Sequence, residues 1–312
     1  MSLLAMTAVA YAQEYPSRPV RVIVPFPPGG PNDLVVRPVA PRLQEYLGQP
    51  FVVDNRAGAN GIIGSELVAK APPDGHSLLV ISSSFTINPA THAKLPFDPL
   101  KDFAPVISLA TSDIILVVNP TVPSKTVKEF VALAKSRPGK LNYASSGTGG
   151  SLHLAGELLK MTSGINMVHV PYKGAALALS DVVGGHVDSM FIAVPPVLPQ
   201  LKSGRLRILA VASAKRASSL PDVPTFIEAG LPDVKVDSRY GLLTGAHVPA
   251  AVIAKLGAAT AKALALPDVR EKLAAMGMDA SGMPAQEYAA YLREDVAKWK
   301  KVVAAAKLPP ME

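Results

Sequence analysis

Cysteine is absent from this chain of 312 residues. Disulfide bonds and thiolate metal sites are therefore excluded. Aromatic residues make up only 5% of the chain, so the base-stacking surfaces typical of single-strand nucleic-acid binders are not expected. The net charge of +7 is scattered in small clusters and not gathered into a stripe, and we predict no nucleic-acid partner.

Long apolar runs are also missing, because no segment after the N-terminus reaches 18 uninterrupted apolar residues. The run Leu3–Ala10 is too short to span a bilayer. Together with the small-x-small sequence Ala10-Tyr11-Ala12 it has the form of a secretory signal, although a charged n-region is missing. We predict a signal peptide over residues 1–12 and an exported mature protein. An ordinary disordered N-terminus is the alternative.

Apolar residues are plentiful at 49%, enough for a large core and roughly two domains. Short apolar runs alternate with helical stretches, a pattern typical of an α/β fold with parallel sheets. One block ends near Asp102, and the chain crosses back near Pro221. Strands are predicted at 20–24, 51–53, 78–81, 106–109, 114–118, 141–144, 167–170, 189–192, 208–212 and 234–243, and helices at 33–47, 61–71, 126–135, 151–161, 175–183, 250–265 and 284–306.

Local signals refine three of these helices. Thr126 with Glu129 three residues later forms a capping box. Ser151 is the predicted N-cap of the helix over 151–161. Pro38 and Pro41 are awkward inside a helix over 33–47, so we expect a kink or a late start there.

Two glycine-rich segments carry the strongest functional signal. The first is Pro27-Pro-Gly-Gly-Pro-Asn-Asp33 and the second is Ser145-Ser-Gly-Thr-Gly-Gly-Ser151. Each follows a short apolar strand and precedes a helix start, where unpaired backbone N–H groups favour a carboxylate or phosphate. Because the segments lie over 100 residues apart, they indicate two lobes closing on one small anion. Asn32 or Asp33 would cap the first helix, or orient waters or a ligand amine.

Neither segment matches a known catalytic or cofactor loop. The second lacks the Gly-Lys-[Ser/Thr] end of a P-loop and the Gly-x-Ser-x-Gly of a nucleophile elbow. The spacing in Gly58–Gly64 is wrong for a dinucleotide site and favours a tight turn with close helix-on-sheet packing. His153 and Glu157 could touch a metal, but nothing completes a ligand set. We predict no catalytic residues, cofactor or metal; a hydrolase or transferase using Ser151 and His153 is the alternative.

Two further features favour a role in ligand recognition. Ser82 and Ser84 follow the strand over 78–81, at the end of a parallel sheet where ligands bind. A polar exit from the strand is the alternative. Arg239 lies in an apolar strand-like run and needs an acceptor, which is either a structural carboxylate or a ligand carboxylate.

The motifs together resemble the Bug family, the extracytoplasmic solute receptors of tripartite tricarboxylate transporters. The resemblance extends from about Tyr15 to Val303. It rests on Tyr15-Pro-x-Arg-Pro-Val-Arg21, Val24-Pro-Phe-x-Pro-Gly-Gly30, Val53-Asp-Asn-Arg-x-Gly-Ala-x-Gly61, Leu95-Pro-Phe-Asp-Pro-Leu-Lys-Asp-Phe103, Asn142-Tyr-Ala-Ser-Ser-Gly147, Val170-Pro-Tyr-Lys-Gly174 and Leu220-Pro-Asp-Val-Pro-Thr225.

The resemblance implies a two-lobed periplasmic-binding-protein fold of type II, the Venus flytrap, in which each lobe is a mainly parallel sheet flanked by helices. Lobe 1 would hold residues 13–103 and 224–312, and lobe 2 residues 104–223. A carboxylate would sit between them. The implied ligand-binding residues are Phe26, Gly29, Gly30, Asn32 and Asp33 on one side and Gly147, Thr148, Gly149, Ser151 and Tyr172 on the other.

Departures from the family pattern concern ligand identity. Pro31 and Asn32 replace small hydroxyl residues, and Ile192-Ala193 stands where many members carry Asp or Asn. We expect Ser82, Ser84, Ala193 and Arg239 to decide the ligand, a small organic mono- or dicarboxylate, possibly aromatic.

The implied partners are the membrane subunits of a tripartite tricarboxylate transporter. The expected protein is a periplasmic, non-enzymatic monomer. A sensor or signalling partner built on the same binding fold is the alternative.

Overall fold

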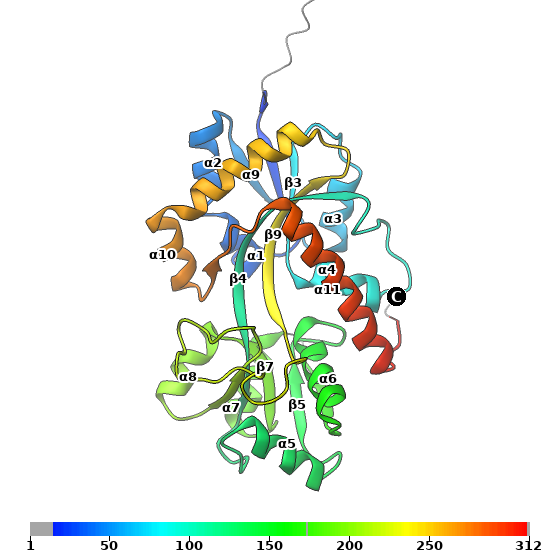
Figure 1. Cartoon of the computed structure of the whole chain (residues 1–312), viewed down its shortest axis with the longest axis vertical. Coiled ribbons are helices and arrows are strands. Elements are labelled where there is room, and N and C mark those ends of the chain that lie inside the picture. Colours follow the sequence, from blue (N-terminus) through cyan, green and yellow to red (C-terminus); the bar gives the residue numbers. More distant parts are fainter. Residues whose placement is uncertain (1–14, 173, 311–312) are drawn as a thin grey trace, which may run out of the picture.

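The residues that the computed structural model describes, 15–172 and 174–310, fold into two lobes, one above the other in Figure 1. Both lobes combine strands and helices, which confirms the predicted α/β fold. The predicted signal peptide at 1–12 lies outside the described residues. The first lobe comprises β1 (Val20–Val24), α1 (Pro31–Val36), α2 (Ala40–Leu47), β2 (Phe51–Asn55), η1 (Ala59–Gly61), α3 (Ile62–Ala69), β3 (Ser77–Ile81), α4 (Ser83–Thr91), α9 (Ala250–Ala265), α10 (Pro267–Ala275) and β10 (Asp279–Ala280).

The second lobe repeats this plan with its own strands and helices. It comprises α5 (Val127–Ser136), β5 (Asn142–Ser145), α6 (Ser151–Ser163), β6 (Val168–Pro171), α7 (Ala175–Gly184), β7 (Ser189–Ala193), η2 (Pro195–Val197), α8 (Leu198–Lys202) and β8 (Arg207–Val211). Three long elements link the lobes: β4 (Phe103–Val118), β9 (Asp237–Gly245) and α11 (Ala285–Ala305).

One sheet runs through both lobes in the order β2-β1-β3-β9-β4-β7-β5-β6. The strands β1, β2 and β3 are parallel to one another, as are β5, β6 and β7. The linking strands pair antiparallel to their neighbours. Each lobe therefore has a parallel sheet that the linking strands extend. The carboxyl ends of these parallel strands, where α/β proteins bind ligands, carry the two glycine-rich segments.

The sequence predicted two strands at 106–109 and 114–118, but the structure has the single strand β4. Its residues Phe103–Asp113 pair with β9, and Ile114–Val118 pair with β7 and β8. Thr111, Ser112 and Asp113 interrupt the apolar pattern, yet each still pairs with a residue of β9. The ladder therefore continues through the polar residues, and β4 and β9 cross between the lobes side by side.

Most local predictions are confirmed. The stretch 33–47 is broken into α1 and α2 around Pro38, as its prolines predicted. Thr126 accepts a hydrogen bond from the Glu129 backbone N–H at 3.1 Å, as the capping box requires. In the turn before α3, Gly61 has φ of +90°, and a Cβ on Gly64 would collide with Pro25. Close helix-on-sheet packing explains these glycines.

Two cap predictions, Ser151 for α6 and Asn32 or Asp33 for α1, were wrong. The N-cap of α6 is Gly150, and Ser151 is the first helical residue. The N-cap of α1 is Gly30, and both Asn32 and Asp33 lie inside the helix. In each case a glycine in the extended conformation is the N-cap: Gly150 directly precedes Ser151, and Gly30 lies two residues before Asn32. The predicted side chains therefore lie inside the helix and not at the cap position.

Helix α11 packs against both lobes. Its first half places Tyr288 and Leu292 in an apolar core with Leu79 of β3. Its second half places Trp299 in another core with Leu158 of α6, and that core also contains Phe226, Val234 and Val236. We therefore propose that the second crossing lies at the start of β9, with residues 224–236 packed on lobe 2. This proposal differs from the boundary between residues 223 and 224 that the sequence predicts.

No single helix among residues 15–172 and 174–310 is long and apolar enough to cross a bilayer. The helices α9 and α10 reach the length and apolar character of a span only when taken together, and they are bent by 74° relative to each other. Both helices contribute buried residues to the core of the first lobe, among them Leu256 and Leu273.

Candidate ligand-binding site

A cleft of about 470 Å³ lies between the two lobes, beside the crossing strands. The first glycine-rich segment contributes Gly29 and Pro31 to its wall, and the second contributes Ser146 and Ser151. Ala193 at the end of β7 also lines it. The structure thus brings three predicted site residues, Gly29, Ser151 and Ala193, into one cavity with contributions from both lobes.

Asp33 holds the first segment from inside the protein. Only 1% of Asp33 is exposed, and its carboxylate accepts hydrogen bonds from Gly29 N (2.9 Å), from Asn55 Nδ2 (3.0 Å) and from Arg37 Nε (2.6 Å). Burial by itself raises the pKa of Asp33, but these hydrogen bonds outweigh burial and leave the pKa below its ordinary value. Asp33 therefore stays ionised and shapes the segment, and the Gly29 N–H points at Asp33.

Further hydrogen bonds hold the first segment, and one of its buried polar groups has no partner among the described residues. Asn55 also donates to the backbone oxygen of Phe26 at 3.1 Å, which fixes the end of β1. Gly30 donates to Pro27 O at 3.4 Å, a long hydrogen bond. Asn32 is 5% exposed, and its Nδ2 has no hydrogen-bond partner among the described residues. Buried amides are normally satisfied, so Asn32 is the group of this segment that most needs a polar partner.

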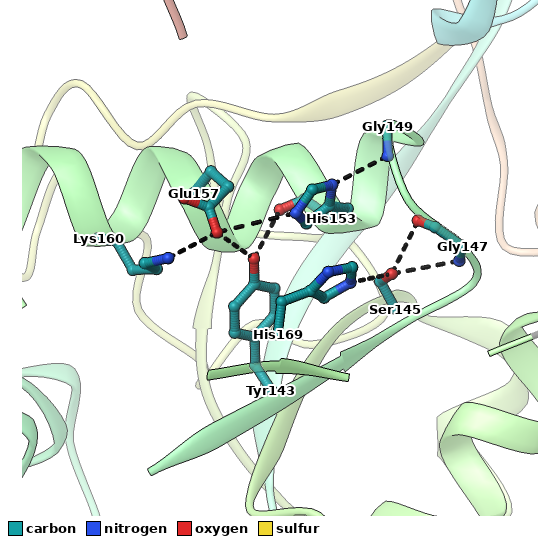
Figure 2. Close-up of polar contacts among 8 residues, drawn as sticks. All are labelled: Tyr143, Ser145, Gly147, Gly149, His153, Glu157, Lys160 and His169. Carbon is teal, nitrogen blue, oxygen red and sulfur yellow. Dashed lines mark hydrogen bonds and ion pairs between the residues drawn. The ribbon is translucent and has the colours of Figure 1, made fainter. Parts of the chain in front are cut away.

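A hydrogen-bonded layer of aromatic and histidine side chains supports the second segment (Figure 2). The Gly149 N–H donates to His153 Nδ1 at 2.9 Å, and the Gly147 N–H donates to Ser145 Oγ at 3.2 Å. Ser145 Oγ in turn lies 2.7 Å from His169 Nε2. Gly147 and Gly149 have φ of +145° and +74°, which side chains rarely adopt. These contacts fix the conformation of the segment from beneath.

Both histidines of this layer are held neutral. Their rings stack with centroids 3.8 Å apart. Burial lowers the pKa of His153, and burial together with the neighbouring His153 lowers the pKa of His169 to about 4. His153 Nδ1 accepts from Gly149, so the proton of the neutral ring is assigned to Nε2, on the side of Glu157. Neutral His153 is therefore required for this loop geometry.

Glu157 closes the layer on the helix side. Its Oε1 accepts from Tyr143 at 2.5 Å and from Lys160 at 2.7 Å (Figure 2). Burial, followed by the hydrogen bond and charge of Glu157, raises the pKa of Tyr143. A Cβ on Gly156 would collide with the Tyr143 ring, so only glycine at this position lets the ring lie against α6. His153 and Glu157, weighed as metal ligands from sequence, have a supporting role here.

Ser82, Ser84 and Tyr172 do not line the cleft. Ser82 is the N-cap of α4, and its Oγ lies 3.3 Å from Ser84 Oγ. The Tyr172 hydroxyl donates to Asp181 at 2.6 Å, and this hydrogen bond raises the pKa of Tyr172 to about 12. The exposed Thr148 lies in the second segment but is also outside the residues that line the cleft.

The structure places Arg239 apart from the glycine-rich segments. Its neighbours in β9, Ser238 and Tyr240, line the cleft, and Arg239 lines a separate hollow against α11. The guanidinium donates to Ser108 Oγ (3.3 Å) and Ser281 Oγ (3.2 Å) and lies 4.6 Å from the centre of the Tyr291 ring. Successive strand residues face opposite sides of a sheet. Arg239 therefore lies on the face of β9 away from the cleft, and it would have to reach the opposite face to contact a ligand there.

Several residues that line the cleft were not predicted. Ser238 and Tyr240 come from β9, and Ser112 and Ile114 come from β4 at the crossing. Period-2 alternation around Arg239 was a signal that could have found Ser238 and Tyr240. Nothing local marks Met276, which lines the cleft from the end of α10. Its position depends on how α10 packs on the first lobe.

The described residues form neither a metal site nor a serine–histidine pair poised for catalysis. Among residues 15–172 and 174–310, no group of three His, Asp or Glu side chains could hold a metal ion. His153 follows Ser151 by two residues, but its Nδ1 accepts a hydrogen bond from the Gly149 N–H. A nitrogen that already accepts from a backbone amide is not positioned to take a proton from a serine hydroxyl.

A two-lobed α/β fold with a cleft at the crossing strands, formed by one loop from each lobe, defines the class of solute-binding proteins. The chain belongs to the tripartite tricarboxylate transporter family of receptors, because residues 35–308 match the sequence model of that family. This confirms the Bug resemblance, and members of the family are receptors and not enzymes.

Relatives agree with this assignment. BugT of Bordetella pertussis is 34% identical over 96% of this chain and 92% of its own length. A solved periplasmic transporter structure is 42% identical, with a TM-score of 0.79 over 95% of this chain and 99% of that chain. An R. palustris protein with adipate is 33% identical (TM-score 0.80; 95% and 100% covered). MatC from Rhodopseudomonas palustris, with bound malate, is 34% identical (TM-score 0.77; 93% and 100% covered).

Proposed function

We propose that this protein captures a small organic carboxylate in the cleft and presents it to the membrane subunits of a tripartite tricarboxylate transporter. The observation that carries the proposal is that both glycine-rich segments, one from each lobe, line the same cavity. Adipate and malate, bound by two relatives, are both carboxylates, which supports the ligand class. We place the mature protein in the periplasm, exported by the signal peptide predicted at 1–12.

The residues proposed to contact the carboxylate come from the two segments. On the first lobe they are Phe26, Gly29, Gly30 and Asn32, with Asp33 acting through its bond to Gly29. On the second lobe Ser151 contacts it at the start of α6, and Gly147 and Gly149 act by shaping the loop before it. The positive end of α6 adds a favourable interaction with an anion of about 0.3–1 kcal/mol.

A thermal-shift screen tests the proposal. The protein is unfolded and refolded to remove any retained ligand, then heated with a panel of organic acids, sugars and amino acids. A bound ligand raises the melting temperature in proportion to RT ln(1 + [L]/Kd). Stabilisation by organic acids supports the proposal, and stabilisation by sugars or amino acids alone contradicts it.

Matched variants locate the site. Ser151→Ala removes a hydroxyl that lines the cleft, and Ser136→Ala removes an exposed hydroxyl at the end of α5. We expect the first variant to weaken binding of the best acid about 3- to 30-fold and the second to leave it unchanged.

Pull-down of the transporter membrane subunits only with ligand-loaded protein would support delivery. Ligand-dependent capture of a sensor kinase in their place would favour the signalling alternative.

A further inference from the structure

The walls of the cleft carry no charged side chain among the residues that the structure describes. Their polar side chains are hydroxyls, of which Ser112, Ser146 and Ser151 are examples, and Ser238 Oγ bonds the Tyr240 hydroxyl at 3.3 Å. The rest of the surface is apolar or backbone. A set of hydroxyl and backbone N–H donors can satisfy one carboxylate, but burial of a second unpaired carboxylate carries a large desolvation cost.

The apolar part of the wall comes from both lobes. Leu34 and Met276 belong to the first lobe, and Leu152 and Ile192 belong to the second. When the lobes close on a ligand, these side chains would cover its body from two sides. An alkyl or aromatic body gains free energy from such burial, whereas an ionised group there would lose its water.

The nearest arginine of the crossing strands does not supply the missing charge. Arg239 is turned to the hollow that it shares with Tyr291 and Lys298 of α11. Its side chain bonds Ser108 and Ser281 in that direction. At the end of β7 the apolar side chains of Ile192 and Ala193 both line the cleft.

From this lining we propose that the ligand is a monocarboxylate with an apolar body, in contrast to the dicarboxylates adipate and malate held by two relatives. The proposal rests on the proposed function and narrows its substrate class. The single carboxylate binds at the glycine-rich segments, and the apolar body contacts Leu34, Ile192 and Met276.

Pairs of acids that differ by one carboxylate test this directly. Hexanoate and adipate share a six-carbon chain, and benzoate and terephthalate share a ring. Dissociation constants are measured by calorimetry at pH 7.5, where all four acids are fully ionised. We expect the monocarboxylate of at least one pair to bind ten times or more tighter than its dicarboxylate. Adipate and terephthalate binding as tightly as their partners, or tighter, would overturn the proposal.

The proposed function fails in a different way. If none of the four acids binds, and the wider screen yields only sugars or amino acids, carboxylate capture itself is contradicted. If a dicarboxylate binds more tightly than its monocarboxylate partner, the proposed carboxylate binding is retained and only the assignment of a monocarboxylate is contradicted.

Charge variants add an independent arm. Met276→Lys places a cation at the cleft wall, and Met161→Lys places one on an exposed part of α6. We expect the first variant to improve adipate binding relative to hexanoate by about tenfold and the second to change neither. An unchanged ratio in Met276→Lys would contradict an apolar ligand body beside Met276.

Arg205 is a cation in a hollow beside the cleft, where a second carboxylate could bind. A neighbouring hollow shares Ala175, Ile192 and Pro196 with the cleft and contains Arg205, whose Nε donates to Ser203 Oγ at 3.2 Å. We expect Arg205→Ala to leave both hexanoate and adipate affinities within twofold. A tenfold loss confined to adipate would show that a dicarboxylate reaches Arg205 and would overturn the proposal.

Discussion

At the scale of single residues, Arg239 is a charged side chain of a strand that contacts other side chains of the protein. Its guanidinium bonds two serine hydroxyls and lies over the Tyr291 ring. We expect Arg239→Ala to lower the free energy of unfolding by about 1–2 kcal/mol, because hydrogen bonds and a cation–π contact are lost. Ligand affinity should stay within twofold. Urea denaturation and calorimetry measure the two effects.

A matched substitution separates the roles of Arg239. Arg239→Lys keeps the positive charge but loses the planar fork that reaches both hydroxyls. It should recover less than half of the lost stability. A tenfold loss of affinity in Arg239→Ala, with unchanged stability, would restore the ligand clamp that the sequence predicted.

His169 gives a prediction about pH. Burial and the stacked His153 lower its pKa to about 4, so the folded protein favours the neutral ring. The charged groups that face this pair are Glu157 and Lys160, and Tyr143 stacks on His169. An unfolded histidine titrates near pH 6.5, so stability should be full above that pH and fall toward pH 4.

The expected loss between pH 7.5 and pH 4.5 is on the order of 1–2 kcal/mol for His169, since the ring is only partly buried. Urea midpoints at the two pH values measure it. In His169→Asn the dependence on pH should be reduced, and in His247→Asn, at an exposed position, it should be preserved. Equal pH dependence in wild type and His169→Asn would contradict a role for this ring.

The candidate site was only partly visible in the sequence, for a physical reason. Glycine-rich loops are local signals, and the structure places Gly29 and Ser151 of these loops on one cleft. The groups that orient these loops come from distant positions, such as Asn55 beneath the first and His169 beneath the second. Such long-range pairing leaves no local pattern, so the sequence gives no sign that Asn55 donates to Asp33.

At the scale of elements, helix α5 shows where local rules suffice. The capping box predicted from Thr126 and Glu129 is present, and Glu129 Oε2 also accepts from Lys125 N at 2.6 Å. We expect Thr126→Ala to cost about 1 kcal/mol of stability without altering ligand affinity, since one helix N–H loses its acceptor. Thermal unfolding of Thr126→Ala beside Thr126→Ser, which keeps the cap oxygen, measures it. Equal losses in both variants would contradict the capping role.

Strand β4 shows where local rules fail. A polar triplet, residues 111–113, divides two apolar runs and predicted a loop. Pairing with β9 over that triplet keeps the backbone extended, and β9 lies over 100 residues further along the chain. Helix breaks at Pro38 were predicted because proline acts within one turn of the helix. Whether β4 continues through the polar triplet depends on pairing with the distant strand β9. The positions where the chain crosses between the lobes depend on the same pairing.

At the scale of the whole molecule, helix α11 joins the two lobes beside the crossing strands (Figure 1). Its middle is fixed by Asp295, which is 5% exposed and accepts from Thr86 Oγ1 at 2.6 Å and from Trp299 Nε1 at 3.1 Å. Thr86 lies on α4 of the first lobe, and Trp299 packs in the core of the second. A helix anchored in both cores couples their unfolding.

We therefore expect the two lobes to unfold in one cooperative transition. Trp299 is the only tryptophan of the chain, so its fluorescence reports the α11 contact with lobe 2, and far-ultraviolet circular dichroism reports both lobes. The two signals should have coincident urea midpoints. Trp299→Ala should lower the free energy of unfolding by about 3–5 kcal/mol through the cavity it leaves. Lys301→Ala, at an exposed position of α11, is the matched control and should change it by less than about 0.5 kcal/mol. Two separated transitions in the wild-type protein would show that α11 does not couple the lobes.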